Sequence, residues 1–215
     1  DIKTTADRFW KQHTHGETKL ITPQQARRLR STHFSFSFVR NPFDRLVAAY
    51  NNKILEIDEV PRPMRRMGLH HNMPFPQFID TICRCNPEEL DNHVKPQSDM
   101  LLAGDILVPK FVGRMEHINE HWRALRRRMR RENLPTLGKL PSKNVRRKGR
   151  EDILNCFNTT NLIDTVLERY SQDFERFYTA YSVDELLKGD QLIKQPPLQR
   201  GAARTQTIQS LQPTA

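Results

Sequence analysis

The chain has 215 residues, enough for one domain with a sizeable core, and no apolar run in it approaches the roughly 20 residues of a membrane-spanning helix. A spanning helix and a secretory signal peptide are therefore both excluded within this sequence. Its 35 Lys and Arg against 25 Asp and Glu give a net charge of +10, which favours an anionic partner: a nucleotide, an acidic glycan, nucleic acid or a membrane surface.

The N-terminal part of the chain predicts two short helices with a histidine-containing segment between them. Residues 1–12 place apolar side chains on one side of a helix. Next come His13 and His15, which flank a threonine just before a glycine. Loop histidines are mostly solvated or capping residues, but a pKa near neutrality also suits a histidine to proton transfer. A second helix is expected from Thr22, a capping residue, to Leu29.

The stretch from Phe34 to Tyr50 combines two periodicities. Phenylalanines alternate with serines from Phe34 to Phe38, which predicts a strand with one apolar face. After a turn, apolar residues recur at helical spacing: Phe43, Leu46, Val47, Tyr50 and Ile54. Asn41 suits the N-cap of that helix. The sequence therefore predicts a strand that leads directly into a helix.

Arg40 occupies the junction between that strand and that helix. The first turn of a helix presents unpaired N–H groups, and ligands of open α/β sheets bind beyond the carboxyl ends of the strands. An arginine there can bind a phosphate through two parallel hydrogen bonds. The alternative is that Arg40 and Arg45 pair with Asp44 and cap a surface turn.

The middle of the chain predicts an irregular segment, a helix and a strand. Residues 58–76 are rich in proline, arginine and methionine and are interpreted as a basic surface loop. An amphipathic helix follows at residues 75–84. Ile106 to Gly113 is interpreted as one buried strand.

The helix that follows residue 117 has an apolar face and a strongly basic remainder. Its arginines are Arg123, Arg126, Arg127, Arg128, Arg130 and Arg131. Such a face is usually solvated, and the alternative is a surface for a polyanion. His117 and His121 stand four residues apart, but no third ligand accompanies them, and we predict no metal site. The three cysteines, Cys83, Cys85 and Cys156, have neither zinc-site nor disulfide-framework spacing and are expected to be structural thiols.

The C-terminal third predicts a basic loop, two helices and a tail. Residues 133–150 alternate proline and glycine with Lys and Arg. Two helices then share an apolar stripe: Leu162, Val166, Leu167, Tyr170, Phe174 and Phe177. We expect a single domain over residues 1–194 and a disordered, proline- and glutamine-rich tail over residues 195–215.

The segment Phe-Val-Arg-Asn-Pro-Phe-Asp-Arg-Leu-Val-Ala-Ala-Tyr, which begins at Phe38, resembles the 3′-phosphate-binding motif of carbohydrate sulfotransferases, similar to the chondroitin and heparan sulfate O-sulfotransferases. Further similar segments are His-Val-Lys-Pro-Gln from His93, Phe-Val-Gly-Arg-Met-Glu from Phe111, Leu-Pro-Ser-Lys-Asn from Leu140, and the closing Tyr170 to Phe177. The resemblance covers about residues 11–181.

The resemblance implies an α/β fold with a P-loop-like central parallel sheet flanked by helices. It implies transfer of a sulfuryl group from 3′-phosphoadenosine 5′-phosphosulfate (PAPS) to a hydroxyl of a glycan, without a metal. The implied catalytic residues are His15 and His13, with His15 as the base. The implied donor-binding residues are Arg40, Asn41, Arg45, Ala48, Lys143, Arg146 and Arg147. The implied acceptor contacts are His93, Lys95 and Gln97.

Two departures from the family pattern lead to an alternative. Ala48 stands where the family has a serine, and residues 1–12 hold neither the first strand nor the 5′-phosphosulfate loop that family members carry. We expect either that the chain begins earlier or that it is an inactive relative that binds polyanions. Nucleic acid is disfavoured, because the aromatic residues fall mostly on core stripes. The compartment would be cytoplasmic in a bacterial member and the Golgi lumen in a eukaryotic one.

Overall fold

The computed structural model describes residues 21–140 and 150–188. Along the chain its elements are α2 (Pro23–Leu29), β1 (Phe36–Val39), α3 (Pro42–Tyr50), the π-helix η1 (Asn51–Leu55), α4 (Arg62–Arg66), α5 (Phe75–Arg84), the 3-10 turn η2 (Pro87–Glu89), α6 (Gln97–Leu101), β2 (Leu102–Ala103), β3 (Ile106–Leu107), β4 (Phe111–Arg114), the 3-10 turn η3 (Met115–His117), α7 (Ile118–Arg131), α8 (Arg150–Cys156), α9 (Thr160–Arg169), α10 (Ser171–Phe177) and α11 (Val183–Leu187). The helix expected over residues 1–12 and the tail expected over residues 195–215 lie outside the described residues.

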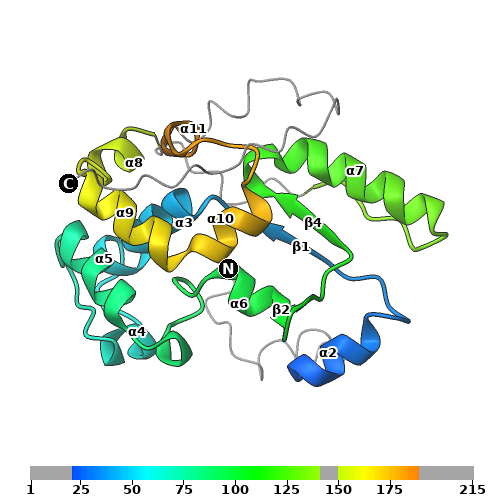
Figure 1. Ribbon diagram of the computed structural model, residues 1–215, viewed down its shortest axis with the longest axis horizontal. Helices are drawn as coiled ribbons and strands as arrows, with labels where there is room; N and C mark the ends of the chain where they lie inside the picture. The colour runs from blue at the N-terminus through cyan, green and yellow to red at the C-terminus, as the bar shows by residue number, and fades with distance from the viewer. Residues whose placement is uncertain (1–20, 141–149, 189–215) are drawn as a thin grey trace, which may run out of the picture.

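The centre of the fold is a pair of parallel strands (Figure 1). β1 pairs with β4 in a register that sets Phe36 opposite Phe111 and Val39 opposite Arg114. α7 follows β4 and packs beside it, while α3 follows β1, so both strands end at the same edge of the sheet and each leads into helical structure. The expected α/β class, with a parallel sheet flanked by helices, is confirmed, although the sheet is small.

The predicted strand from Ile106 to Gly113 is divided in two. Ile106 and Leu107 form β3, which pairs antiparallel with β2, and the chain enters β4 at Phe111. Pro109 lies between the two strands and has no N–H to donate to a ladder, which accounts for the break. The prediction of one continuous strand was therefore wrong.

The phenylalanine face of β1 is only partly buried. Phe36 is 39% exposed, and its ring contacts that of Trp122 edge to face, with the centroids 6.4 Å apart. The ring of Phe38 lies 6.0 Å from that of Trp122. The phenylalanines of β1 contact α7 through Trp122, whereas Val39, on the same face as the serines, is the residue of β1 that is buried in the main core. The alternation of phenylalanine and serine therefore predicts the strand but not its core face.

The main core lies around α3, as its apolar stripe predicts. Phe43, Leu46 and Ile54 are fully buried, and Ile54 belongs to η1, which continues the helix beyond Tyr50. The ring of Phe43 packs against that of Phe157, with the centroids 4.9 Å apart. α5 and α9 pack against each other and complete this core with Phe78 and Val166, among others. The apolar stripe predicted for the last two long helices is thereby confirmed as core.

Residues 58–76 run along the surface as expected, but a short helix and buried apolar side chains anchor the segment in the core. Val60, Met64, Leu69 and Met73 are buried, and Met64 lies on α4. The hydroxyl of Tyr50 donates to the carbonyl of Met73 at 2.7 Å. An apolar residue occurs at every fourth or fifth position of this segment. Because the intervening residues are mostly basic residues and prolines, the sequence predicted a loop.

Candidate functional site

The junction between β1 and α3 forms as the sequence predicts. Asn41 is the N-cap: its side-chain oxygen accepts from the N–H of Phe43 at 3.1 Å, and Pro42 follows as the first helical residue. The amide nitrogen of Asn41 donates to the carbonyl of Leu186 at 2.6 Å. Asn41 is fully buried, so its side chain serves the helix cap and the contact with α11.

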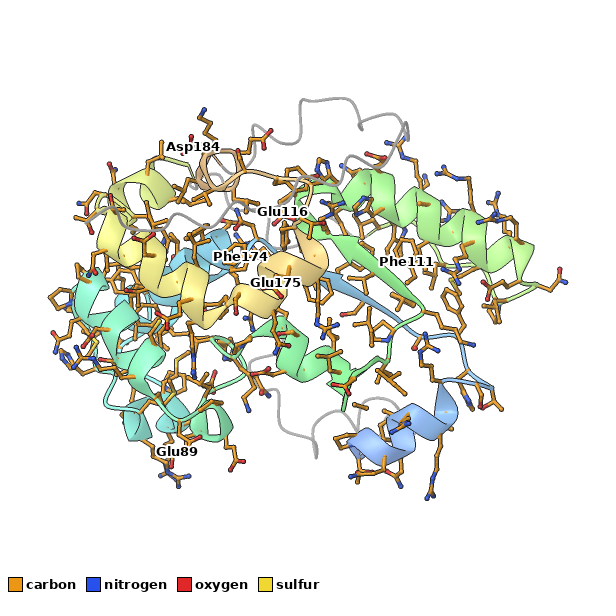
Figure 2. All side chains as sticks on the ribbon, viewed as in Figure 1. Glu89, Phe111, Glu116, Phe174, Glu175 and Asp184 are labelled. Atoms are coloured by element: carbon orange, nitrogen blue, oxygen red, sulfur yellow. The ribbon has the colours of Figure 1, made fainter. Side chains whose placement is uncertain are left out.

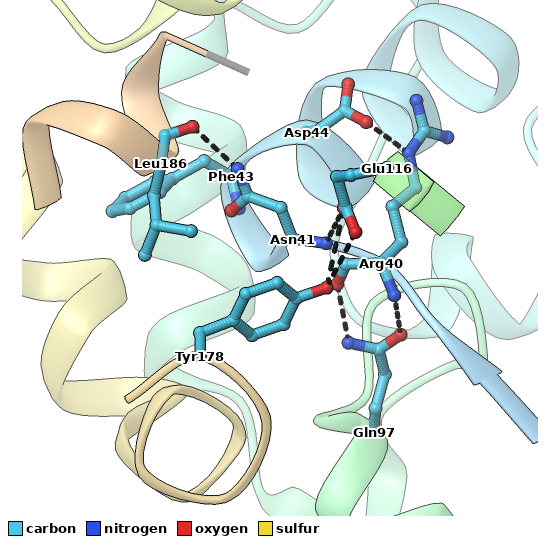
Figure 3. A network of polar contacts seen from close by, with 8 residues as sticks. All are labelled: Arg40, Asn41, Phe43, Asp44, Gln97, Glu116, Tyr178 and Leu186. Atoms are coloured by element: carbon cyan, nitrogen blue, oxygen red, sulfur yellow. Dashed lines mark hydrogen bonds and ion pairs between the residues drawn. The ribbon is translucent and has the colours of Figure 1, made fainter. Parts of the chain in front are cut away.

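Arg40 sits at the carboxyl edge of the parallel sheet with its side chain 37% exposed. Its Nε donates to the carboxylate of Asp44, one helical turn away (Figure 3). The pairing expected of a plain surface turn is therefore present for Arg40. Within the described residues, however, the two terminal nitrogens of the guanidinium have no hydrogen-bond partner. They remain available for the bidentate contact that arginine makes with a phosphate.

The backbone of Arg40 is held by the side chain of Gln97 (Figure 3). The N–H of Arg40 donates to Oε1 of Gln97 at 2.8 Å, and Nε2 of Gln97 donates to the carbonyl of Arg40, also at 2.8 Å. One amide side chain thus satisfies both polar atoms of the residue that follows the last ladder position of β1.

Glu116 fixes the next residue from the other side. Its carboxylate is only 7% exposed and accepts from the backbone N–H of Asn41 and, at 3.2 Å, from the hydroxyl of Tyr178. Figure 2 shows Glu116 inside the molecule near the end of β4, in contrast to Glu89 at the periphery. Burial raises the pKa of Glu116, and the hydrogen bond from Asn41 partly offsets that rise.

The turn at residues 91–97 is bound to the same region by three long-range contacts. Arg45 donates to the carbonyls of Lys95 at 2.5 Å and Asn92 at 2.6 Å. The hydroxyl of Tyr170 donates to the carbonyl of Val94 at 2.5 Å. These contacts, together with Gln97, bring the segments around residues 40–45, 91–98 and 170–173 into one network.

The sulfotransferase family model matches residues 1–179 of this chain, most of its length. The chain belongs to the sulfotransferase family. Family membership indicates sulfuryl transfer, for which sulfotransferases generally use PAPS as the donor. No curated protein and no solved structure gives a significant match to the chain.

Of the residues that the sulfotransferase resemblance implied for donor binding, Arg40 is placed best for it. Arg45 lies close by, but two of its guanidinium N–H groups donate to backbone carbonyls, and burial lowers its pKa. Ala48 is half-buried on α3, one turn beyond Asp44 and therefore on the same face as the Arg40–Asp44 pair. Lys143, Arg146 and Arg147 lie outside the described residues.

The residues implied for acceptor binding differ in their exposure. His93 is exposed, and its Nδ1 lies 2.6 Å from the carboxylate of Asp91. Lys95 is half-buried on the same turn. Gln97 is 5% exposed, and its amide oxygen and nitrogen are already hydrogen-bonded to Arg40 and Asp173. The direct contact predicted for Gln97 has no support in this geometry.

The implied catalytic residues, His13 and His15, lie outside the described residues, and their roles stay predictions. Sequence reasoning assigned no role to Glu116 or Asp173, two acids that the fold buries completely or nearly so. Both have a signal in the sequence: Glu116 lies two residues after the end of a strand, and Asp173 interrupts an apolar helical stripe. A carboxylate at such a position is expected to be paired with a donor.

His117 and His121 are used in hydrogen bonds. Nδ1 of His121 accepts from the backbone N–H of Arg114 at 2.7 Å, and Nε2 of His117 lies 3.1 Å from the hydroxyl of Tyr181. Burial, reinforced by the charge of Arg114, lowers the pKa of both histidines. Among residues 21–140 and 150–188 no group of three potential ligands could hold a metal ion, and no helix is long and apolar enough to cross a membrane.

Proposed function

We propose that this sulfotransferase moves the sulfuryl group of PAPS to a carbohydrate hydroxyl. The observation that carries the proposal is the guanidinium of Arg40, oriented by Asp44 and otherwise unoccupied within the described part of the chain, at the first turn of α3. The terminal nitrogens of this guanidinium form a bidentate cationic group that favours a bound phosphate, which we assign to the 3′-phosphate of the donor.

In the proposed reaction, the acceptor hydroxyl oxygen attacks the sulfur of the donor. The bond between sulfur and the bridging phosphate oxygen breaks, a sulfate ester forms, and 3′-phosphoadenosine 5′-phosphate (PAP) leaves. His15 takes the hydroxyl proton as general base, a task for which histidine is suited near neutral pH. Negative charge builds up on the leaving nucleotide in the transition state. Lys143, Arg146 and Arg147 supply positive charge around the nucleotide and stabilise it. His93 and Lys95, on the turn beside Arg45, contact the glycan.

Calorimetric titration with PAP tests the donor site. The parent is expected to bind, and Arg40→Ala is expected to weaken binding at least tenfold, about 1.4 kcal/mol. The control is Arg127→Ala combined with Arg130→Ala, because both residues are exposed on α7. An equal loss in the two variants would indicate diffuse electrostatic attraction and contradict the proposed site. A second assay measures transfer of label from PAPS to a panel of glycans with unmodified hydroxyls.

A specific observation favours a second candidate, a polyanion-binding module without catalysis. Four arginines of α7 are exposed: Arg123, Arg127, Arg130 and Arg131. Such a module needs that face but neither Arg40 nor His15. Binding of a sulfated polysaccharide that depends on Arg127 and Arg130, in a chain that neither binds PAP nor transfers label, would favour this candidate.

A further inference from the structure

The amide of Gln97 is held in one orientation by Asp173. Asp173 is fully buried, and its carboxylate accepts from the backbone N–H of Gln97 at 2.8 Å and from that of Ser98 at 2.6 Å. The same carboxylate lies 3.3 Å from Nε2 of Gln97. A carboxylate only accepts hydrogen bonds, so the NH₂ group of the amide must lie on the side of Asp173. The oxygen of the amide is thereby directed to the N–H of Arg40.

The chain needs this contact because of where Arg40 lies. The ladder between β1 and β4 ends at Val39, and α3 begins at Pro42, so the peptide groups of Arg40 have partners in neither element. Gln97 supplies both partners from α6, a helix that begins 57 residues later. The guanidinium of Arg40 is then tied at Nε to Asp44. Both ends of the arginine are fixed, and its side chain remains 37% exposed.

We propose that Gln97 is a positioning residue for donor recognition. It holds the backbone of Arg40 so that the outer edge of the guanidinium meets the 3′-phosphate. This inference rests on the proposed function, since it concerns the same phosphate. It replaces the acceptor contact expected for Gln97 and makes Asp173, Gln97 and Arg40 one connected unit.

The test compares PAP with adenosine 5′-monophosphate, two nucleotides that differ only in the 3′-phosphate. Gln97→Met keeps the length of the side chain and removes both hydrogen bonds to Arg40. We expect the affinity for PAP to fall about tenfold, while the affinity for adenosine 5′-monophosphate, which is PAP without its 3′-phosphate, stays within twofold. In the Arg40→Ala background, Gln97→Met is expected to lower the affinity for PAP less than twofold. The control is Gln77→Met, an exposed glutamine on α5.

A second variant covers the case in which Gln97→Met does not fold. In Gln97→Glu, an ionised carboxylate has no hydrogen to donate to the carbonyl of Arg40 and repels Asp173. The protonated acid has one O–H that can donate to that carbonyl and an oxygen that can accept from the N–H of Arg40, so it can restore both contacts with Arg40. We expect its deficit in PAP affinity relative to the parent to shrink at least threefold between pH 8 and pH 5.5. A deficit that is constant with pH would overturn the inference.

The outcomes separate the inference from the proposed function. If the parent does not bind PAP, the proposed function itself fails. If the parent binds PAP and Gln97→Met binds it equally well, or loses both nucleotides equally, Gln97 has no positioning role and the inference is wrong while the donor site stands.

Discussion

Glu116 and Asn41 are linked by a hydrogen bond between elements that are 75 residues apart: the buried carboxylate of Glu116 accepts the backbone N–H of Asn41. The contact joins η3, the turn that follows β4, to the N-cap of α3. Gln97 binds the backbone of the preceding residue, Arg40. Two consecutive backbone positions of the proposed phosphate site are therefore held by side chains from two other elements. The shape of this junction is therefore a property of the whole fold.

The first prediction concerns the pH dependence contributed by Glu116. Its pKa in the folded state is raised above the unfolded value of about 4.3. At a pH between these two pKa values, the native state therefore binds more protons than the unfolded state. The stability that protonated Glu116 contributes is present at low pH and is lost as the pH rises through the raised pKa. As the pH rises, the free energy of unfolding of the parent should therefore fall relative to that of Glu116→Gln. The total fall should be about 1.4 kcal/mol for each unit by which folding raises the pKa.

Urea unfolding at several pH values between 4 and 8 measures this difference. Glu89→Gln, a substitution at an exposed position on η2, is the matched control. A free-energy difference between the parent and Glu116→Gln that does not change with pH would contradict the prediction.

The second prediction tests Ala48, the residue that replaces the serine of the family motif. Ala48 lies on the face of α3 that carries the Arg40–Asp44 pair, so a hydroxyl there reaches toward the proposed phosphate. A hydrogen bond to a charged group contributes about 1.5–3 kcal/mol. Ala48→Ser should tighten PAP binding several-fold and leave adenosine 5′-phosphosulfate unchanged, as measured by calorimetry.

Ala124→Ser is the control for that substitution, because Ala124 is also half-buried on a helix but belongs to α7. If both nucleotides respond alike to Ala48→Ser, or neither responds, position 48 does not contact the 3′-phosphate.

The third prediction concerns the hydroxyl of Tyr170, which is buried and donates to the carbonyl of Val94 at 2.5 Å. Tyr170→Phe leaves that carbonyl without this donor and should lower the free energy of unfolding by about 1–3 kcal/mol. Tyr181→Phe removes the hydroxyl of a partly exposed tyrosine and should cost less. Denaturant titration of the two variants measures both losses. Equal losses would show that the hydrogen bond to Val94 contributes no more to the free energy of unfolding than the hydroxyl of Tyr181 does.

The fourth prediction concerns the catalytic base. In an active preparation, His15→Ala should lower turnover about a hundredfold or more, as expected when a positioned general base is removed, with little change in nucleotide affinity. His13→Ala is the comparison, because it removes the neighbouring histidine. Steady-state transfer kinetics and PAP titration provide the two readouts. If His15→Ala retains its turnover, the base is another group, with His13 and His93 the next to test.

The sequence by itself determined the local elements. The strand–turn–helix around Arg40, its Asn41 cap and the apolar stripes of α3, α5 and α9 all follow from short-range patterns, because backbone geometry sets periods of two and of about 3.6 residues. The family resemblance, which rests on an unbroken run of residues, was also accessible from sequence, and the family match confirms that the chain is a sulfotransferase family member.

Tertiary structure decided which distant polar groups satisfy one another. Nothing in the local pattern of Gln97 shows that its amide lies against the backbone of Arg40, or that Glu116 binds Asn41. The burial of Val60, Met64, Leu69 and Met73 was also not evident from sequence, because basic side chains surround these apolar ones. Periodicity reports which face of an element is apolar, whereas the partners of a buried polar atom are set only when elements far apart in the chain pack together and exclude water.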